Sequence, residues 1–313
     1  MKTKNLIVSA CMLCCISPIL AQVTEAEKKL KTLETDTIVG WKTGGVTGIN
    51  LAQTALVNWA AGGQSSIAVN GLFSIFANYK SPENAWDNSL DIGYGLLKQG
   101  KNSFMKTDDK IDFLSKYGRK AFADFYYTAL VNFKTQFSPG YNYPNDSVKI
   151  SNFLAPAYML VAVGLNYQPN SYFNAFLAPV TGKLTIVNDD VLSAAGAFGV
   201  EPGKKTKQEF GGYARIIYSR NDFKSEFLKN VAFTTKIDLF SNYLKDPQNI
   251  DVSWENQLAL KVNKYITINL NTQLVYDADV KTAIDTNGDG IMDSEKAKVQ
   301  FKEILGIGFS YNF

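Results

Sequence analysis

The sequence predicts an all-β fold, a transmembrane antiparallel up-and-down β-barrel of about twelve strands with short periplasmic turns and longer extracellular loops. Three observations predict it. Twelve stretches alternate polar and apolar residues with period two, the connections between them alternate in length, and aromatic residues are abundant at 13%, with 16 Tyr and 20 Phe. Membrane-spanning barrels alternate apolar outward and polar inward residues and carry aromatic girdles at both water interfaces.

The clearest strand is the last one, residues 298–313. One face carries Val299, Phe301, Leu305, Ile307, Phe309, Tyr311 and Phe313. Glu303 interrupts this face. Either it lies in the headgroup zone near the external end of the strand, or a bulge shifts the phase there. A terminal strand needs a partner, and a closed barrel provides one in the strand that starts at Trp41.

The other strands are expected from the same alternation and from the breaks between them. Short breaks alternate with long ones, and two connections, 219–230 and 244–249, fit the alternation less well. A secreted β-sandwich would also alternate, but its turns would not alternate in length. An even strand count places both termini in the periplasm. The expected strands are 41–51, 67–79, 86–98, 111–117, 121–137, 153–167, 172–186, 209–218, 231–243, 251–262, 265–276 and 298–313.

The N-terminus reads as a secretory signal. Lys2 and Lys4 precede an apolar run that ends before the small residue Ala21, so residues 1–21 are expected to be cleaved. A membrane anchor is the competing interpretation, but the run is short and contains Pro18. Residues 22–40 are then a polar periplasmic segment and residues 41–313 the barrel. Together these features predict the outer membrane of a Gram-negative bacterium.

Composition argues against several classes of function. The 32 Lys and Arg are spread among 29 Asp and Glu, so no concentrated basic patch for nucleic acid is present. All three cysteines lie in the predicted signal, at Cys11, Cys14 and Cys15, and the chain has no histidine. A Ser-His-Asp or Cys-His catalytic arrangement is therefore impossible. We expect no catalytic residues, no enzymatic activity and no organic cofactor.

One segment has the residue types and spacing of a calcium loop. Oxygen ligands at alternate positions and a glycine at the turn suit Ca²⁺. The twelfth position, where an EF-hand needs Glu, is Lys296, so the segment is more similar to the shorter loops of thrombospondin-type repeats. The alternative is a turn-forming external loop. If calcium binds, it is structural, and its ligands are Asp285, Asn287, Asp289, Ile291 and Asp293.

The polar face of the strands predicts a charged lumen. Both signs are mixed there, which leaves two functions open. One is a porin-like small-solute channel. The other is a structural or interaction barrel that has a closed, ion-paired lumen and acts as a partner of an envelope assembly. Strand number alone does not separate them. The charges expected to face the lumen are Asp87, Asp91, Asp124, Lys134, Arg215, Lys236, Asp238, Glu255 and Lys261.

Several segments resemble a known family. These are WKTGGVTGINLAQTALVNWAAGG, NGLFSIFANYK, WDNSLDIGYGLLKQG, SKYGRKAFADFYY and the ending VQFKEILGIGFSYNF. They are similar to the Bacteroidetes family known as domain of unknown function 3078 (DUF3078). The resemblance implies an outer-membrane β-barrel in contact with lipid, and it implies no site residues. Phe309, Tyr311 and Phe313 resemble the assembly signal read by the barrel insertion machinery, which would be a partner during biogenesis.

Overall fold

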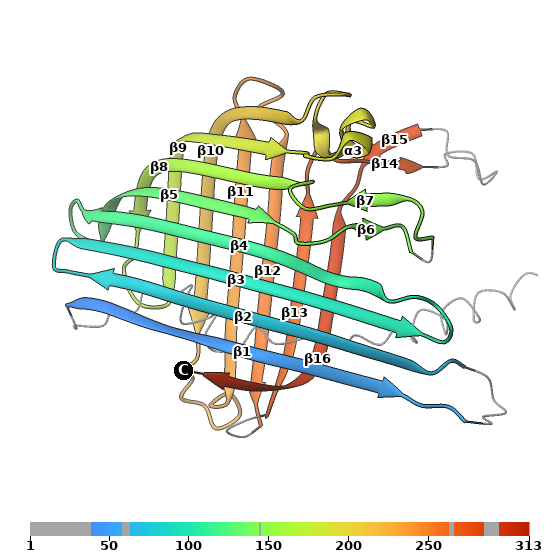
Figure 1. The fold of residues 1–313 in the computed structure, drawn as a ribbon. Coiled ribbons are helices and arrows are strands. Elements are labelled where there is room, and N and C mark those ends of the chain that lie inside the picture. Colours follow the sequence, from blue (N-terminus) through green and yellow to red (C-terminus); the bar gives the residue numbers. More distant parts are fainter. Residues whose placement is uncertain (1–38, 58–62, 144, 263–265, 285–293, 313) are drawn as a thin grey trace, which may run out of the picture.

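The protein forms a closed antiparallel barrel in the computed structural model, which describes residues 39–57, 63–143, 145–262, 266–284 and 294–312 (Figure 1). Within these residues twelve strands close the barrel in the order β1-β16-β13-β12-β11-β10-β9-β8-β5-β4-β3-β2. The prediction of about twelve antiparallel strands is confirmed. The bounds are β1 (Gly40–Thr54), β2 (Ser66–Lys80), β3 (Asn84–Gln99), β4 (Met105–Lys120), β5 (Phe125–Thr135), β8 (Ala157–Tyr167), β9 (Phe173–Ile186), β10 (Thr206–Arg220), β11 (Val231–Asn242), β12 (Ile250–Lys261), β13 (Ile266–Tyr276) and β16 (Gln300–Asn312).

The two ends of the barrel differ in their connections. At one end, the short-turn end, residues 81–83, 121–124 and 168–172 join neighbouring strands, and 221–230 is a longer connection. At the other, the long-loop end, the connections carry additional elements. These are β6 (Gly140–Tyr141), β7 (Lys149–Ser151), α3 (Asp190–Ala194), the 3₁₀ turn η1 (Ala197–Gly199), β14 (Lys281–Ile284) and β15 (Ser294–Ala297). The first strand begins and the last strand finishes at the short-turn end.

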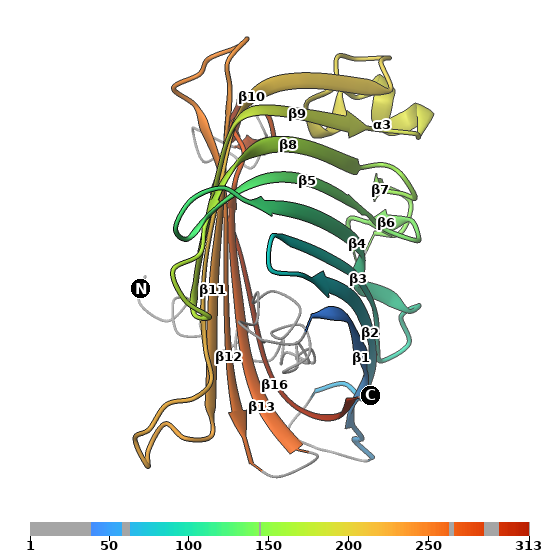
Figure 2. The same cartoon turned by 90° about the vertical axis from the view of Figure 1, so that its left-hand side faces the viewer.

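The barrel is flattened into two walls. In Figure 1 the strands from β1 to β5 run across the view, whereas β11, β12 and β13 behind them run nearly vertically. Figure 2 shows the walls meeting at the β9–β10 corner at the top and near β1 and β16 at the bottom. Strands far apart in the sequence can therefore face each other across the interior.

Two glycines lie where the ladders change register. The pairing of β8 with β9 shifts between Val163 and Leu165, and that of β10 with β9 shifts after Gly211. A Cβ at Gly164 would lie 2.0 Å from the carbonyl oxygen of Leu177. Neighbouring backbone approaches these positions too closely for any side chain.

The closing seam between β1 and β16 is short. Every residue of β1 pairs with β2, from Gly40 opposite Lys80 to Thr54 opposite Ser66. Among the described residues, only Val46 to Ile49 pair with β16. The seam is thus the briefest ladder of the closed sheet.

Two details of the predicted strands are corrected. β4 extends well beyond the predicted 111–117, because its early polar residues find partners: Asp109 accepts backbone hydrogen bonds from Phe137 (2.7 Å) and Ser138 (2.9 Å). β16 pairs with β13 without a register shift, and Glu303 lies opposite Thr272. A bulge therefore does not explain Glu303, which stays on the outward row near the long-loop end.

Some predicted features fall outside the described residues. They are the signal 1–21, nearly all of the segment 22–40, the terminal Phe313, and the calcium-loop residues Asp285, Asn287, Asp289, Ile291 and Asp293. In the described part of the chain, no helix is long and apolar enough to cross a membrane. In the same part, no group of three or more His, Cys, Asp or Glu side chains is placed to hold a metal ion.

Candidate functional site: the barrel interior

Burial along the strands shows which side chains face the interior. In β5, Thr128 and Asn132 are 3% and 8% exposed, whereas Tyr127 is 61% exposed. In β10, Arg215 is 6% exposed and the next residue, Ile216, is 40% exposed. At these positions polar and charged residues are buried and apolar ones face outward, the reverse of a water-soluble domain. The interior is therefore where the polar chemistry of this chain is concentrated.

The predicted lumen-facing charges occupy the inward rows with one exception. Asp124 lies in the turn 121–124 and is exposed. Its placement on a strand was wrong because the backbone turns at Ala123, which has φ 45°, and β5 begins only at Phe125. Lys261 is exposed at the last position of β12. The remaining seven lie inside the barrel, and they are Asp87, Asp91, Lys134, Arg215, Lys236, Asp238 and Glu255.

The central ion pair joins Arg215 of β10 to Asp238 of β11. Arg215 Nε donates to Asp238 Oδ1 at 2.5 Å and Nη2 donates to Oδ2 at 3.0 Å. The hydroxyl of Tyr213 donates to the same carboxylate at 2.7 Å. The two side chains are 8% and 12% exposed. Such a bidentate, buried pair depends on both partners, because either alone would be an uncompensated charge.

Other inward charges pair in the same way between neighbouring strands. Lys236 of β11 lies 2.8 Å from its register partner Glu255 of β12. Lys134 of β5 lies 3.6 Å from its partner Asp112 of β4. Opposite charges placed directly across a ladder stabilise the sheet. A further pair of this kind is Asp87 with Lys116, at 3.7 Å. The inward carboxylate of Asp91 instead accepts a hydrogen bond from the hydroxyl of Ser74.

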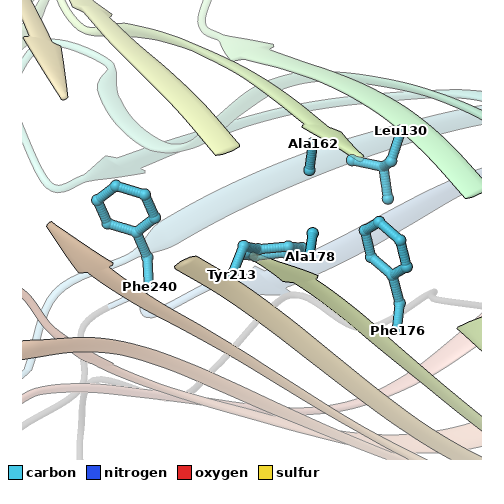
Figure 3. Close-up of a cluster of buried hydrophobic side chains, with 6 residues drawn as sticks. All are labelled: Leu130, Ala162, Phe176, Ala178, Tyr213 and Phe240. Carbon is cyan, nitrogen blue, oxygen red and sulfur yellow. The ribbon is translucent and has the colours of Figure 1, made fainter. Parts of the chain in front are cut away.

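Large side chains from both walls fill the space beside these pairs. Figure 3 shows the cluster of Leu130, Ala162, Phe176, Ala178, Tyr213 and Phe240. A cavity next to it is lined by residues of β3, β4 and β5 and of β9, β10 and β11, and its volume is about 40 Å³. One water molecule needs about 10–15 Å³ on the same measure. This cavity has room for a few water molecules, and we call this part of the interior, between β3–β5 and β9–β11, the filled side.

A second charged cluster covers the filled side at its long-loop end. Lys183 Nζ lies 2.8 Å from Asp251, 3.5 Å from Glu209 and 3.8 Å from Asp277. Lys183 also sits 4.9 Å from the ring centre of Phe240. Because Asp277 lies in the connection after β13, this lysine ties that loop to β9, β10 and β12. Sequence reasoning missed Asp277 because it lies in a stretch predicted to be a loop.

A third cluster organises the loops outside the barrel strands. Asp189 accepts hydrogen bonds from Lys149 Nζ (2.7 Å) and from Asn152 Nδ2 (2.9 Å). The same carboxylate caps α3 by accepting from the backbone N–H groups of Val191 and Leu192. The hydrogen bond from Lys149 is the main cause that lowers the pKa of Asp189 to about 2. One carboxylate thus joins the β5–β8 and β9–β10 connections.

This geometry predicts an acid-sensitive loop. A carboxyl whose folded pKa is about 2, below the ordinary value of about 3.9, contributes stability that is complete above pH 4 and is lost as the pH falls towards 2. We expect the amides of Val191 and Leu192 to lose hydrogen-exchange protection in that interval, after correction for intrinsic exchange. Asp189→Asn should show weak protection that does not change with pH. An equal loss in the variant would contradict this assignment.

The outward surface carries aromatic side chains in contact near the short-turn end. The ring of Trp41 lies 5.4 Å from Tyr79 and 5.7 Å from Trp86, and Phe125 lies 4.7 Å from Tyr167. These residues come from the starts of β1, β3 and β5 and the ends of β2 and β8. Farther along the same faces, exposed apolar residues follow, among them Ile67, Phe73, Phe113, Val161, Val163, Leu177, Ile216, Leu258 and Leu260.

The comparisons with known proteins agree with part of the sequence interpretation. Residues 51–141 match the family described as "Protein of unknown function (DUF3078)". The resemblance to DUF3078 is confirmed for this segment. The DUF3078 segment runs from the end of β1 to β6 and contains Asp87, Asp91 and Lys134. Arg215, with the later charges of the interior, lies outside it. No curated protein matches the chain.

Three solved structures align with this chain at low identity. An outer membrane channel from Pseudomonas putida F1 is 9% identical, with a TM-score of 0.41, over 89% of this chain and 97% of that chain. The translocator domain of the autotransporter NalP from Neisseria meningitidis is 8% identical, with a TM-score of 0.37, over 91% and 92%. The outer membrane phospholipase A from Escherichia coli is 11% identical, with a TM-score of 0.36, over 88% and 98%. The closed barrel follows from the pairing of the strands themselves.

Proposed function

We propose that this protein is a non-enzymatic β-barrel of the outer membrane that acts as a narrow small-solute channel. Both termini face the periplasm at the short-turn end, and the long loops face outward from the cell. The passage follows the wall formed by β12, β13, β16 and β1, which are consecutive in the barrel. The observation that carries this proposal is the difference in inward-facing residues between that wall and the filled side.

Membrane insertion is supported by the outward surface. A soluble protein rarely exposes so much contiguous apolar surface. Here that surface alternates with inward rows that are rich in polar residues, as it does in barrels whose outer face contacts lipid. The aromatic contacts among Trp41, Tyr79 and Trp86 lie at one edge of the apolar zone, where a lipid-water interface favours such rings.

The passage is supported by residue size. On β1 the inward row includes Gly44 and Gly48, which lie opposite Phe76 and Leu72 of β2. Besides the charged Asp251, Glu255, Lys261 and Lys302, the inward rows of the next strands include short or neutral residues. These are Ser253, Gln257 and Ala259 on β12, Asn271 and Gln273 on β13, and glycines at 306 and 308 of β16. The filled side instead carries Phe176, Tyr213, Arg215 and Phe240. Small residues leave space where large ones close it.

One ion pair bridges strands that are not neighbours. Lys302 of β16 lies 3.7 Å from Asp108 of β4, although β1, β2 and β3 separate these strands in the sheet. Both residues stand near the long-loop end. The pair therefore crosses the interior there and limits the width of the passage at its outer mouth.

Cysteine blocking in a planar bilayer tests the channel. The chain has cysteines only at positions 11, 14 and 15, so single-cysteine variants of the mature protein are unambiguous. With Ser253→Cys, on the small-residue wall, a bulky charged thiol reagent should reduce single-channel conductance several-fold, because the adduct occupies the passage. With Asn132→Cys, which lines the small cavity of the filled side, the reagent should leave conductance unchanged.

The outcomes separate the two functions left open by the sequence. Conductance steps that are blocked at Ser253→Cys only support the channel and its position. Purified protein that inserts in the bilayer without any steps would reject the channel and favour a structural barrel with a closed, ion-paired lumen. Steps blocked only at Asn132→Cys would place the passage on the other side.

A further inference from the structure

The connection between β10 and β11, residues 221–230, carries a highly exposed aromatic side chain. Phe227 is 88% exposed, and no other large hydrophobic side chain whose exposure the structure describes is as exposed. A single exposed apolar residue is common on protein surfaces. Its meaning therefore depends on how this connection is held and on what lies beside it.

Side-chain contacts hold the base of the connection in one place. The guanidinium of Arg220 lies 4.9 Å from the ring centre of Tyr172 and 5.3 Å from that of Phe223. Asp222 accepts hydrogen bonds from Arg220 Nε, at 3.1 Å, and from the hydroxyl of Tyr172. Cation-π contacts and hydrogen bonds to a charged group are directional. They join the connection to the neighbouring β8–β9 turn and fix the direction in which it leaves the sheet.

The connection extends away from the barrel interior. Figure 2 shows it as the gold loop at the lower left, on the side of β11 and β12 that faces away from the strands β1 to β5. The outward residues of β12 stay apolar to the end of the strand and past it, since Leu258, Leu260 and Val262 are 40%, 41% and 55% exposed. Val231, which follows the connection, pairs with Leu260. The connection therefore leaves the sheet at the edge of the outward apolar surface.

Aromatic rings and lysines accompany the connection on this outward side. Lys224 and Lys229 lie on the connection itself and are exposed. Tyr218 and Phe233, on the adjoining ends of β10 and β11, have ring centres 6.5 Å apart. Aromatic rings and long lysine stems can lie against apolar groups while their polar ends stay in water, so both residue types suit a lipid-water interface. A further row of rings in contact at the same end of the barrel consists of Phe122, Phe125, Tyr167 and Phe173.

From this placement we propose that the connection 221–230 is an interfacial lipid anchor. Phe227 inserts among the upper acyl chains of the phospholipid leaflet at the short-turn end, and Lys224 and Lys229 stay at the level of the headgroups. The inference rests on the proposed membrane barrel and adds a lipid contact outside its strands. Phospholipid is the occupant that fits, because the outward surface beside the connection is the apolar surface that faces lipid in a membrane barrel.

Fluorescence quenching in lipid nanodiscs tests the anchor. The discs contain phosphatidylcholine and leave both faces of the bilayer open to the solution, and the fluorophore is attached to Ser225→Cys, in the same turn as Phe227. A phospholipid with a quencher at the top of its acyl chain should quench this label several-fold more strongly than aqueous iodide does. Phe227→Ser should reverse that ratio. The matched control is Phe122→Ser, which removes another exposed ring at the short-turn end and should leave the ratio unchanged.

Two further labels separate failure of the anchor from failure of the membrane barrel. Leu258→Cys, on the outward row of β12, should be quenched by lipid, and Lys204→Cys, exposed in the β9–β10 connection, by iodide. Lipid quenching at position 225 that disappears with Phe227→Ser and persists with Phe122→Ser supports the inference.

The other outcomes overturn the anchor. Iodide quenching at position 225 in the otherwise wild-type chain, or lipid quenching there that survives Phe227→Ser, overturns the inference and leaves the barrel standing if position 258 is quenched by lipid. Protection of position 225 from both quenchers would indicate contact with a second copy of this chain and would also overturn it. Absence of lipid quenching at position 258 overturns the membrane barrel and the anchor together.

Discussion

Replacing Asp238 by alanine is expected to lower the free energy of unfolding by about 3–5 kcal/mol, because it leaves a buried guanidinium without its counter-charge. Arg215 makes two hydrogen bonds to this carboxylate, and Tyr213 makes a third. The loss would be measured by urea unfolding of the protein refolded into lipid vesicles, followed by the fluorescence of its Trp residues.

Two variants serve as controls for this prediction. Glu226→Ala removes an exposed pair with Lys229 in the 221–230 connection, and it should cost less than about 1 kcal/mol. The double variant Arg215→Met, Asp238→Leu should recover much of the loss, since apolar replacement of both partners removes the unpaired charge. Equal destabilisation by Asp238→Ala and Glu226→Ala would show that losing the buried carboxylate costs no more free energy of unfolding than losing an exposed one.

Replacing Gly211 by alanine is expected to destabilise the barrel by about 1–3 kcal/mol or more, through overpacking against backbone. A Cβ there would lie 1.9 Å from the carbonyl oxygen of Ser241 and 2.9 Å from its carbonyl carbon. Backbone cannot move aside as a flexible side chain would, so the ladder between β10 and β11 must open locally. Refolding yield and the temperature at which the compact form unfolds on a denaturing gel would report the loss.

Gly182 is the matched control for this substitution. It lies one strand away on β9, opposite Phe210, and no atom lies within 4 Å of an added Cβ. Gly182→Ala should therefore refold like the wild type. If both alanine variants refold equally well, the close approach of β10 and β11 at Gly211 is not a constraint on the fold.

The strands were predictable because successive residues of a strand face opposite sides of the sheet, so the polarity of each residue indicates the side it faces. Period-two alternation located all twelve strands, whereas the register that places Arg215 opposite Asp238 is known only from the structure. Boundaries were less predictable. β4 begins in a polar stretch that looked like a loop, and it is held in the sheet by contacts such as that of Asp109 with Ser138. Asp124 was misplaced because a tight turn has no apolar period to mark it.

Contacts across the interior could not be predicted from the sequence. Alternation says that Lys302 and Lys183 face inward, but not which acids of other strands they meet. Those partners, Asp108 and Asp251, follow from how the two walls approach each other. The filled side and the small-residue wall likewise emerge only when the strands are arranged in the closed sheet. The Asp189 cluster joins two long connections that no periodicity describes.

The short seam between β1 and β16 has a consequence for the surrounding lipid. Four paired residues correspond to about 13 Å of ladder, at about 3.3 Å per residue, whereas the apolar band of an outer-membrane barrel is about 25 Å tall. Among the described residues, the backbone N–H and C=O groups that face the seam beyond these pairs lack ladder partners there, and hydrocarbon cannot satisfy them. The lipid can respond by shortening its own apolar layer. We therefore expect the bilayer to be thinnest along this one line of the barrel, where headgroups and water reach down to the unpaired edges.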